Sequence, residues 1–182
     1  MNEFEIRLRA LEPSDLDILY KWENDPEVWK VSHTLTPYSK YILQKYIENS
    51  HFDIYQTRQL RLMIDLIESE DKKPVTIGTI DLFDFDPYNN RAGIGILIGD
   101  KSHRKKGYAT AALKQFLDYV FNTLQLHQVY CNIAEGNEES LKLFQNLGFE
   151  IVGVKKEWLK RQNKYEDEYI LQLLKDWWVE ES

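Results

Sequence analysis

The sequence predicts an α+β fold, a mixed and mostly antiparallel twisted sheet with helices on both faces. Three observations lead to this prediction. Residues 58–99 carry short runs of strand periodicity with no helical pattern between them. Helical periodicity precedes and follows those runs. The last third returns to strand periodicity, so strands and helices do not alternate regularly along the chain.

The N-terminal part is expected to form a strand and two helices. Apolar side chains alternate over residues 4–8. The first helix is expected to start at residues 13–15, where proline, serine and aspartate suit a first turn. It should end at Asp25, because the residue before a proline resists the helical conformation. Its apolar face is expected to comprise Leu16, Leu19 and Tyr20. A second helix is expected from Thr36, as its N-cap, to about Asn49.

Changes of period predict the remaining elements. An antiparallel meander is expected from the strands 58–67, 75–85 and 91–99. A helix over 107–122 should turn inward Ala111, Ala112, Phe116 and Val120. The elements expected after it are a strand at 127–133, a short helix from Glu138 that Gly148 ends, and two strands at 149–159 and 165–174. Residues 1–182 are expected to form a single domain, since no linker or repeat interrupts the pattern.

Charge and cysteine content exclude several classes of protein. The chain has 23 Lys and Arg against 30 Asp and Glu, a net charge of -7, which argues against an extended surface for nucleic acid. The single cysteine, Cys131, excludes an internal disulfide and indicates a reducing compartment. The longest apolar run, residues 92–99, is too short to span a bilayer. We therefore expect a cytoplasmic protein that binds neither nucleic acid nor membrane.

A basic segment, HRKKGYAT at residues 103–110, lies between a predicted strand and a predicted helix. The first amides of a helix have no internal acceptor and lie at the positive end of its dipole, so they bind anions. Gly107 has no β-carbon and lets a phosphate approach the backbone. The neighbouring Arg104, Lys105 and Lys106 add positive charge. The segment therefore predicts a cradle for a phosphate group rather than a track for nucleic acid.

Two motifs carry a resemblance to a known family. Arg104-x-x-Gly107-x-Ala109 fits the Q/R-x-x-G-x-G/A pattern of the GNAT superfamily of acetyl-CoA-dependent N-acetyltransferases. Residues 137–153, NEESLKLFQNLGFEIVG, resemble that family's N-x-x-S-x-x-x-[YF]-x-x-x-G-F signature. The C-terminal stretch KYEDEYILQLL is similar to the branch that holds ribosomal-protein N-terminal acetyltransferases and the spermidine and spermine acetyltransferases.

The resemblance implies direct transfer of the acetyl group of acetyl-CoA to a primary amine, which is a polyamine, a protein N-terminus or another small amine. It also implies a homodimer or other homo-oligomer. The backbone amides that would hold the CoA pyrophosphate are those of Arg104, Lys105, Lys106, Gly107, Tyr108 and Ala109. Pairing with the pantetheine arm as an extra strand is implied for Leu97, Ile98 and Gly99, one of whose amides would polarise the thioester carbonyl.

Three residues of the second motif are implied to lie along the pantetheine arm: Asn137, Ser140 and Phe144. The alternatives are that Asn137 only caps its helix and that Ser140 and Phe144 only pack. In the polyamine branch a tyrosine of this helix often supplies an acid, and a glutamate before the cradle often helps to deprotonate the amine. The matching positions here hold Phe144 and Gly93.

Other residues are candidates for the chemistry. By segment length, Asp81 and Asp84 match carboxylates of the polyamine branch, and this resemblance implies that Asp84 holds or deprotonates the amine and that Asp81 binds it, with solvated or turn aspartates as the alternative. The tyrosines that could replace the missing one are Tyr108, Tyr130, Tyr165 and Tyr169, with packing as the alternative.

One further hypothesis stays open. The residues Phe144 and Gly93 also fit a GNAT-like module that binds acyl-CoA with little or no turnover. Residues 31–39 lack the paired glutamates of the polyamine branch's regulatory site, which disfavours spermidine as the acceptor and control by polyamines. The four histidines show no metal-ligand spacing, so no metal site is expected.

Overall fold

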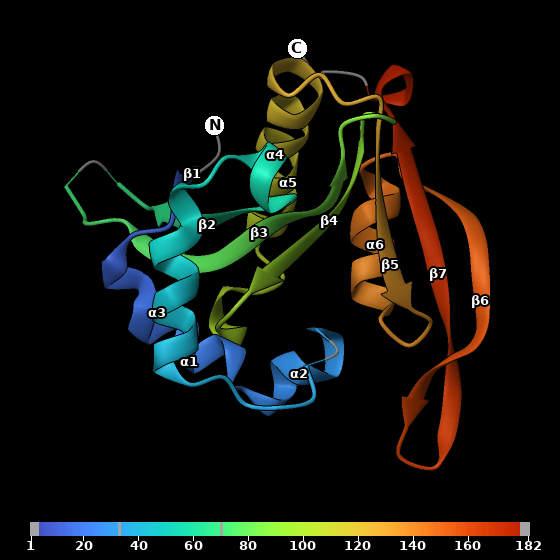
Figure 1. Ribbon diagram of the computed structural model, residues 1–182, viewed down its shortest axis with the longest axis horizontal. Helices are drawn as coiled ribbons and strands as arrows, with labels where there is room; N and C mark the ends of the chain where they lie inside the picture. The colour runs from blue at the N-terminus through green and yellow to red at the C-terminus, as the bar shows by residue number, and fades with distance from the viewer. Residues whose placement is uncertain (1–3, 33, 70, 179–182) are drawn as a thin grey trace.

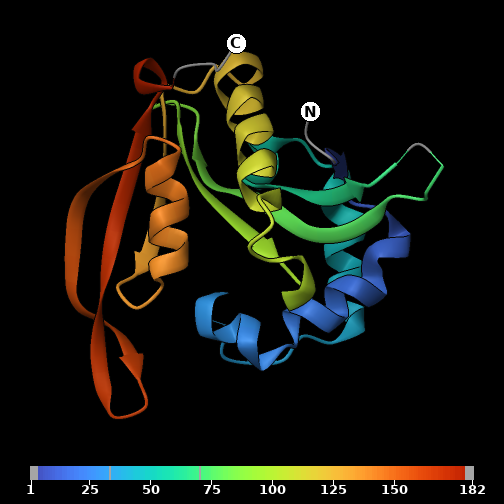
Figure 2. The ribbon, with the colours of Figure 1, turned by 180° about the vertical axis from the view of Figure 1, so that it is seen from behind.

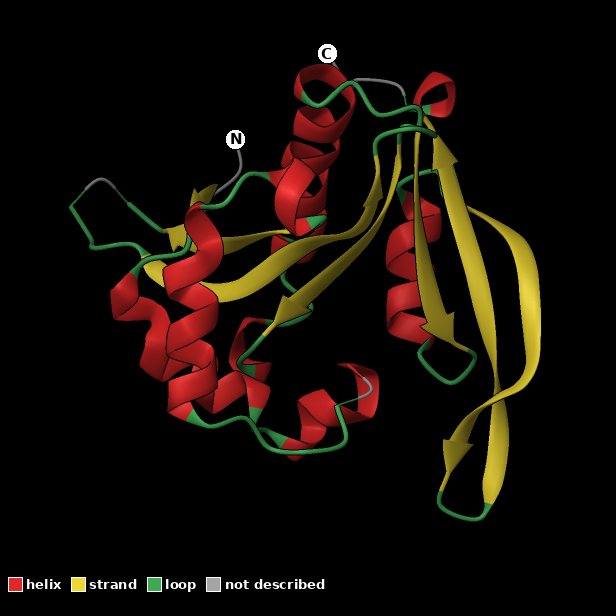
Figure 3. Cartoon of the chain, in the orientation of Figure 1, coloured by secondary structure: helices red, strands yellow, loops and turns green. Residues whose placement is uncertain are grey.

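The computed structural model describes residues 4–32, 34–69 and 71–178, which form a seven-stranded sheet with helices on both faces (Figures 1 and 3). The strands are β1 Glu5–Ala10, β2 Leu60–Ile67, β3 Val75–Asp86, β4 Arg91–Ile98, β5 Gln128–Ala134, β6 Glu150–Arg161 and β7 Lys164–Leu174. The α-helices are α1 Leu16–Glu23, α2 Pro26–Ser32, α3 Lys40–Glu48, α4 Ile54–Thr57, α5 Tyr108–Asp118 and α6 Glu138–Asn146. Among the described residues, no helix is long and apolar enough to cross a bilayer.

The strand order is β1-β2-β3-β4-β5-β7-β6, and neighbouring strands are antiparallel except for the parallel pair β4 and β5. The expected meander is confirmed as β2, β3 and β4. The predicted α+β class, with a mostly antiparallel sheet, is confirmed as well. The chain crosses from β4 to β5 through α5, as a parallel connection requires.

Two apolar clusters lie on opposite faces of the sheet. The larger one packs α5 against the inner strands, with Phe116 and Leu82 fully buried. The smaller one packs α1 and α3 against the other face, where Trp22 and Met63 are buried. Figure 2 shows α5 and α6 in front of the sheet, with α3 partly behind it. The first half of the sheet is therefore covered on both faces.

Several local predictions are wrong. Ser39, and not Thr36, caps α3, because its side chain accepts a hydrogen bond from the amide of Ile42. Tyr20 is 39% exposed and does not belong to the apolar face of α1, which is formed by residues three positions apart, at 19 and 22. Pro26 follows the end of α1 as expected, but it also begins α2, where a first-turn proline costs no hydrogen bond.

The strands β4 and β5 pair over only three residues, ending at Gly93 opposite Tyr130. Beyond that point β4 continues along β3, while β5 continues along β7, so the two strands diverge (Figure 1). The divergence leaves the facing edges of β4 and β5 without strand-to-strand pairing. We call this region the splay and the Gly93–Tyr130 end of it the closed end.

Candidate active site

The loop after β4 leads into α5 through two residues with positive φ, Lys105 at 61° and Gly107 at 83°. Gly107 is the N-cap of α5 and brings no side chain to cap it. A β-carbon on Gly107 would meet only Phe4 Cζ, at 3.9 Å, so backbone conformation rather than crowding favours glycine here. The first-turn amides of α5 therefore lie behind an open, side-chain-free entrance, which fits a pyrophosphate.

The basic side chains of this loop differ in the partners that they bind. Arg104 turns back onto β4, where its Nε donates to the carbonyl of Ile98 at 3.1 Å and its Nη2 to that of Gly99 at 3.2 Å. Lys105 forms an exposed ion pair with Glu139 of α6, at 2.7 Å. Arg104 thus holds the loop against the strand, and Lys105 links the loop to α6. The amide of Arg104 donates to the carbonyl of Lys101 at 3.1 Å, so the prediction that it binds the pyrophosphate is wrong, and the later amides of the segment and the exposed Lys106 remain for an anion.

The end of β4 presents backbone rather than side chains to the splay. Leu97 packs toward α1, whereas Ile98 is buried on the α5 side of the sheet. A β-carbon on Gly99 would lie 2.1 Å from Trp22 Cε2, so the strand end lies directly on this indole. The amide of Gly99 donates to the carbonyl of Ile77 in β3 at 2.9 Å, and Arg104 binds the carbonyls of Ile98 and Gly99, so Gly99 has no free backbone group for a ligand. Pairing with a ligand in the splay falls to the other backbone groups on the β4 edge that faces β5.

The residues of the second motif cap and pack in this structure. Asn137 Oδ1 accepts from the amide of Ser140 at 3.3 Å and so caps α6. The ring of Phe144 is buried and stands edge-on to Phe149, with centroids 5.1 Å apart. These contacts match the alternatives that the sequence left open for Asn137 and Phe144. They leave their contribution to pantetheine binding as a prediction.

The closed end of the splay is filled by an aromatic ring. A β-carbon on Gly93 would lie 2.2 Å from Phe83 Cε2, so a side chain at this position would require the Phe83 ring to move. The Phe83 ring in turn stands edge-on to Tyr130, at 6.2 Å and 83°. The place where the polyamine branch often carries a glutamate is therefore occupied by Phe83.

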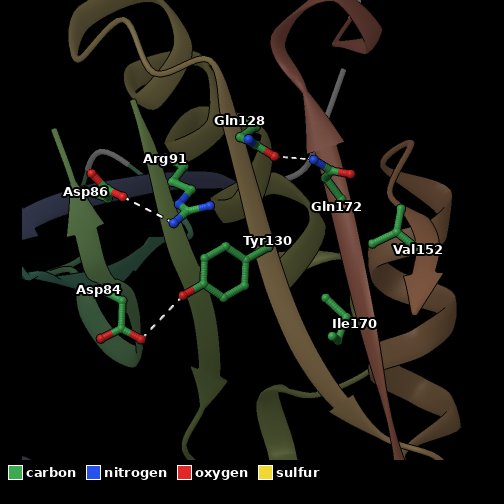
Figure 4. Close-up of a pocket in the computed structure, with 8 residues that line it drawn as sticks. All are labelled: Asp84, Asp86, Arg91, Gln128, Tyr130, Val152, Ile170 and Gln172. Carbon is green, nitrogen blue, oxygen red and sulfur yellow. Dashed lines mark hydrogen bonds and ion pairs between the residues drawn. The ribbon is translucent and has the colours of Figure 1, made fainter. Parts of the chain in front are cut away.

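Asp84 lies in a bulge that interrupts the β3–β4 register between Phe83 and Asp86. Its φ is 49°, a left-handed conformation that costs an aspartate about 1 kcal/mol. Such bulges redirect side chains, and here Asp84 points toward β5 (Figure 4). The hydroxyl of Tyr130 donates to Asp84 Oδ2 at 3.3 Å. Burial, followed by the charge of Asp84, raises the pKa of Tyr130 above its ordinary value of 10.0.

A pocket of about 400 Å³ surrounds this pair, and we call it the Asp84 pocket. It is lined by Asp84, Asp86, Arg91, Gln128, Tyr130, Val152, Ile170 and Gln172 (Figure 4). Arg91 forms an ion pair with Asp86 at 3.2 Å. Across residues 4–32, 34–69 and 71–178, no cationic side chain pairs with Asp84. This carboxylate is therefore available to a cationic ligand.

A second pocket, of about 340 Å³, lies between the sheet and the helices α1 and α3, and we call it the Asp81 pocket. Its lining is Glu23, Tyr38, Ile42, Leu43, Tyr46, Gln59, Leu60, Arg61, Asp81, Leu82 and Phe83. Arg61 binds Asp81 through Nε at 2.5 Å and Nη2 at 3.2 Å, and it binds Glu23 through Nη1 at 2.6 Å. Burial raises the pKa of Asp81 despite the opposing charge of Arg61. The residue predicted to bind the amine is thus already paired with an arginine.

Sequence reasoning missed Arg61 and Glu23. Arg61 and Asp81 are direct partners in the β2–β3 register, so a correct register would have shown their pairing. Glu23 comes from the end of α1, and no periodicity in the sequence links it to β2.

The four candidate tyrosines lie in different places. Tyr108 packs edge-on against Phe4, and Tyr165 is exposed on the β6–β7 hairpin. The hydroxyl of Tyr169 donates to Glu135 at 3.5 Å, a long contact. Of these four, Tyr130 is the one that lines a pocket at the closed end of the splay.

No three histidine, cysteine, aspartate or glutamate side chains gather as metal ligands in the part of the chain that the structure describes. His33, one of the four histidines considered above, lies outside that part.

Comparisons with known proteins agree with this geometry. The family model of the acetyltransferase (GNAT) domain matches residues 5–150. The chain is 29% identical to an uncharacterized N-acetyltransferase, p20, of Bacillus licheniformis, over 93% of both chains. It is 28% identical to the spermidine N(1)-acetyltransferase of Vibrio cholerae, over 92% of this chain and 94% of that protein. The crystal structure of the V. cholerae spermidine N-acetyltransferase with CoA and spermine has the same fold, with a TM-score of 0.82 at 24% identity, covering 94% of this chain and 96% of that one.

Proposed function

The chain belongs to the GNAT acetyltransferase family, whose members transfer the acetyl group of acetyl-CoA to an amine, and we propose where each substrate binds. CoA binds in the splay, with its pyrophosphate against the first turn of α5 and its pantetheine arm along Leu97–Gly99. The amine enters through the Asp84 pocket. One observation carries this proposal: the sheet opens between β4 and β5 beside a helix start whose N-cap, Gly107, has no side chain.

The proposed acceptor is a small amine that arrives as a cation, polyamines and peptide N-termini included. An alkylamine with a pKa near 10.4 is neutral in about one molecule in 10³ at pH 7. The ammonium form therefore has to be held and then deprotonated. Asp84 suits this task, because it lines a pocket and no cation among the described residues neutralises it. The relative from V. cholerae is named for spermidine, which supports including polyamines in this class.

Each proposed role belongs to an identified group of this chain. Bound acetyl-CoA supplies the thioester that the amine attacks. A backbone amide on the free edge of β4 polarises the thioester carbonyl, which stabilises the charge that develops on its oxygen. The first-turn amides of α5 fix the pyrophosphate, and Asp84 positions the nitrogen. This scheme uses no metal ion.

We further propose that the protein works in the cytoplasm and forms a homo-oligomer. Apolar side chains of β6 support self-association, since Ile151, Val152 and Val154 are exposed and Trp158 lies further along the same strand.

Substitution of Gly107 tests the cradle. Gly107→Asp should weaken CoA binding about a hundredfold, because the left-handed backbone is strained by a side chain and the carboxylate repels phosphate. The matched control is Gly107→Asn, which tolerates positive φ and adds no charge, and which should weaken binding much less. Calorimetric titration with CoA measures both affinities. Equal affinities for wild type and Gly107→Asp would contradict the cradle.

Turnover is tested by release of the CoA thiol from acetyl-CoA in the presence of spermidine, spermine, peptides with free N-termini or amino sugars. Acetyl transfer to at least one of them is expected. CoA binding without thiol release for any amine would support the alternative, a binding module without turnover.

A further inference from the structure

The transfer reaction needs a proton donor as well as a site for the amine. The carbon–sulfur bond breaks with its electron pair on sulfur, and the sulfur then takes up a proton. Phe144, at the position where the polyamine branch often has a tyrosine, has no proton to give. A side-chain donor would therefore come from another element near the closed end of the splay.

Tyr130 occupies that place. It is the β5 residue opposite Gly93, in the last residue pair before β4 and β5 diverge. Its side chain reaches into the Asp84 pocket, and its hydroxyl contacts a carboxylate there (Figure 4). An edge-on contact with Phe83 holds the ring from the other side. The hydroxyl is thus fixed at the end of the splay and open to a ligand in the pocket.

The surrounding charges are arranged for this role. Arg91 pairs with Asp86, and Gln128 accepts a hydrogen bond from Gln172, so each of these four side chains already has a partner other than Asp84 and Tyr130. Asp84 and Tyr130 are left as partners of each other. The strained backbone of Asp84 indicates that the fold sustains a cost to aim this carboxylate at Tyr130.

We propose that Tyr130 is the proton donor of the acetyl transfer and that Asp84 returns the proton to it, an inference that rests on the proposed function. Asp84 binds the ammonium group, takes one proton from it and releases that proton to water. The nitrogen then forms the bond to the acetyl carbon. Tyr130 gives its hydroxyl proton to the leaving sulfur, and the second proton of the nitrogen passes through Asp84 to the Tyr130 oxygen. One proton has then reached the sulfur and one the solvent, so the step is balanced.

Burial and the charge of Asp84 raise the pKa of Tyr130, so its hydroxyl is protonated at neutral pH. No free tyrosinate remains after the step, because the Tyr130 oxygen receives a replacement proton through Asp84.

The test is Tyr130→Phe, assayed with an amine that the wild-type protein acetylates. The variant keeps the ring and its contact with Phe83 and loses only the hydroxyl. We expect kcat at saturating amine to fall about 10²-fold, with the KM for acetyl-CoA, the Kd for CoA and the thermal midpoint unchanged. The matched control is Tyr88→Phe, at a tyrosine that is 93% exposed in the β3–β4 turn, and it should retain wild-type rates. Tyr130→His, which retains a proton donor on a ring, should recover part of the rate.

Two outcomes would overturn the role of Tyr130. A kcat within threefold of wild type would show that the hydroxyl carries no proton in the rate-limiting step, and an effect confined to the KM for the amine would show that it only positions Asp84. A double-mutant cycle adds a further check: Asp84→Asn combined with Tyr130→Phe should cost about as much as the worse single variant, because the two act as a unit. Multiplying losses would contradict the relay. Absence of turnover in the wild type would instead contradict the proposed function, and this role with it.

Discussion

The Asp81 pocket and the Asp84 pocket each contain two carboxylates and one arginine, yet they differ in what these charges do. In the Asp81 pocket, Arg61 binds both carboxylates. In the Asp84 pocket, Arg91 binds Asp86 alone, and Asp84 is bonded to a tyrosine. The first arrangement fixes α1 to the sheet, and the second leaves a carboxylate for a ligand. The comparison shows that the pairing of charges, rather than their number, distinguishes a structural cluster from a reactive one.

The difference has a cause in the strands. Arg61 and Asp81 face each other in a regular part of the β2–β3 ladder, so the sheet itself builds their ion pair. Asp84 lies in the bulge of β3, where the regular register with β4 is interrupted. The bulge removes Asp84 from cross-strand pairing and turns it toward β5.

The largest expected effect that separates the two pockets is on stability. Arg61→Met should lower the free energy of unfolding by about 3 kcal/mol, because it leaves two partly buried carboxylates without their cation. Arg91→Met is the matched control in the Asp84 pocket and should cost much less stability, since its pair with Asp86 is more exposed. Denaturant unfolding followed by fluorescence measures both. Equal losses would show that the pockets do not differ in this way.

The next effect is on catalysis. Here a substitution in the Asp84 pocket should have a larger effect than one in the Asp81 pocket. Asp84→Asn should lower kcat/KM for the amine at least tenfold, about 1.4 kcal/mol, because the variant neither attracts nor deprotonates an ammonium group. Its stability should stay close to wild type or rise slightly, since asparagine tolerates the left-handed backbone. Asp81→Asn should instead reduce stability and affect kcat/KM less. If Asp81→Asn impaired catalysis more than Asp84→Asn, the amine site would belong to the Asp81 pocket.

The smallest effect concerns one tyrosine in each pocket. Burial raises the pKa of both Tyr46 and Tyr130 above 10, and the charge of Asp84 adds to the increase at Tyr130, whereas Arg61 opposes it at Tyr46. Asp84→Asn should therefore lower the pKa of Tyr130, and Arg61→Met should raise that of Tyr46. Ultraviolet absorbance during alkaline titration follows tyrosine ionisation, and Tyr130→Phe and Tyr46→Phe identify the two transitions. Shifts of the opposite sign would contradict these assignments.

Because of the same two tyrosines, the free energy of unfolding should fall as the pH rises above 10. Because their pKa values are higher in the folded than in the unfolded chain, their contribution is fully present below the unfolded value near 10. It is lost as the pH rises through the folded values. Replacing both with phenylalanine should reduce the loss of stability above pH 10, which thermal unfolding at a series of pH values would show.

The fold could be predicted from the sequence because the patterns that indicate strands and helices are local. Strand periodicity over residues 58–99 and the helix start at Gly107 depend on neighbouring residues, and both elements formed as expected. Tyr20 and Thr36 were misassigned for local reasons as well, since a helix face and an N-cap can each shift by a few residues without changing the composition.

The site was less predictable because its key contacts join distant strands. Asp84 could be named from its segment, but its contact with Tyr130, 46 positions further along the chain, could not. Likewise, nothing in the sequence shows that Arg61 forms an ion pair with Asp81, or that Arg104 folds back and binds the carbonyls at the end of β4. A register error of one residue reverses which side chains share a face, so such pairs require the structure.

The close approach of Phe83 to Gly93 has a consequence for how this protein can evolve or be engineered. A side chain introduced at position 93 meets the Phe83 ring, so a glutamate there requires the ring to move or position 83 to become smaller. Either change alters the ring contact that supports Tyr130. Restoring a glutamate at position 93 is therefore coupled to the position of the Tyr130 ring.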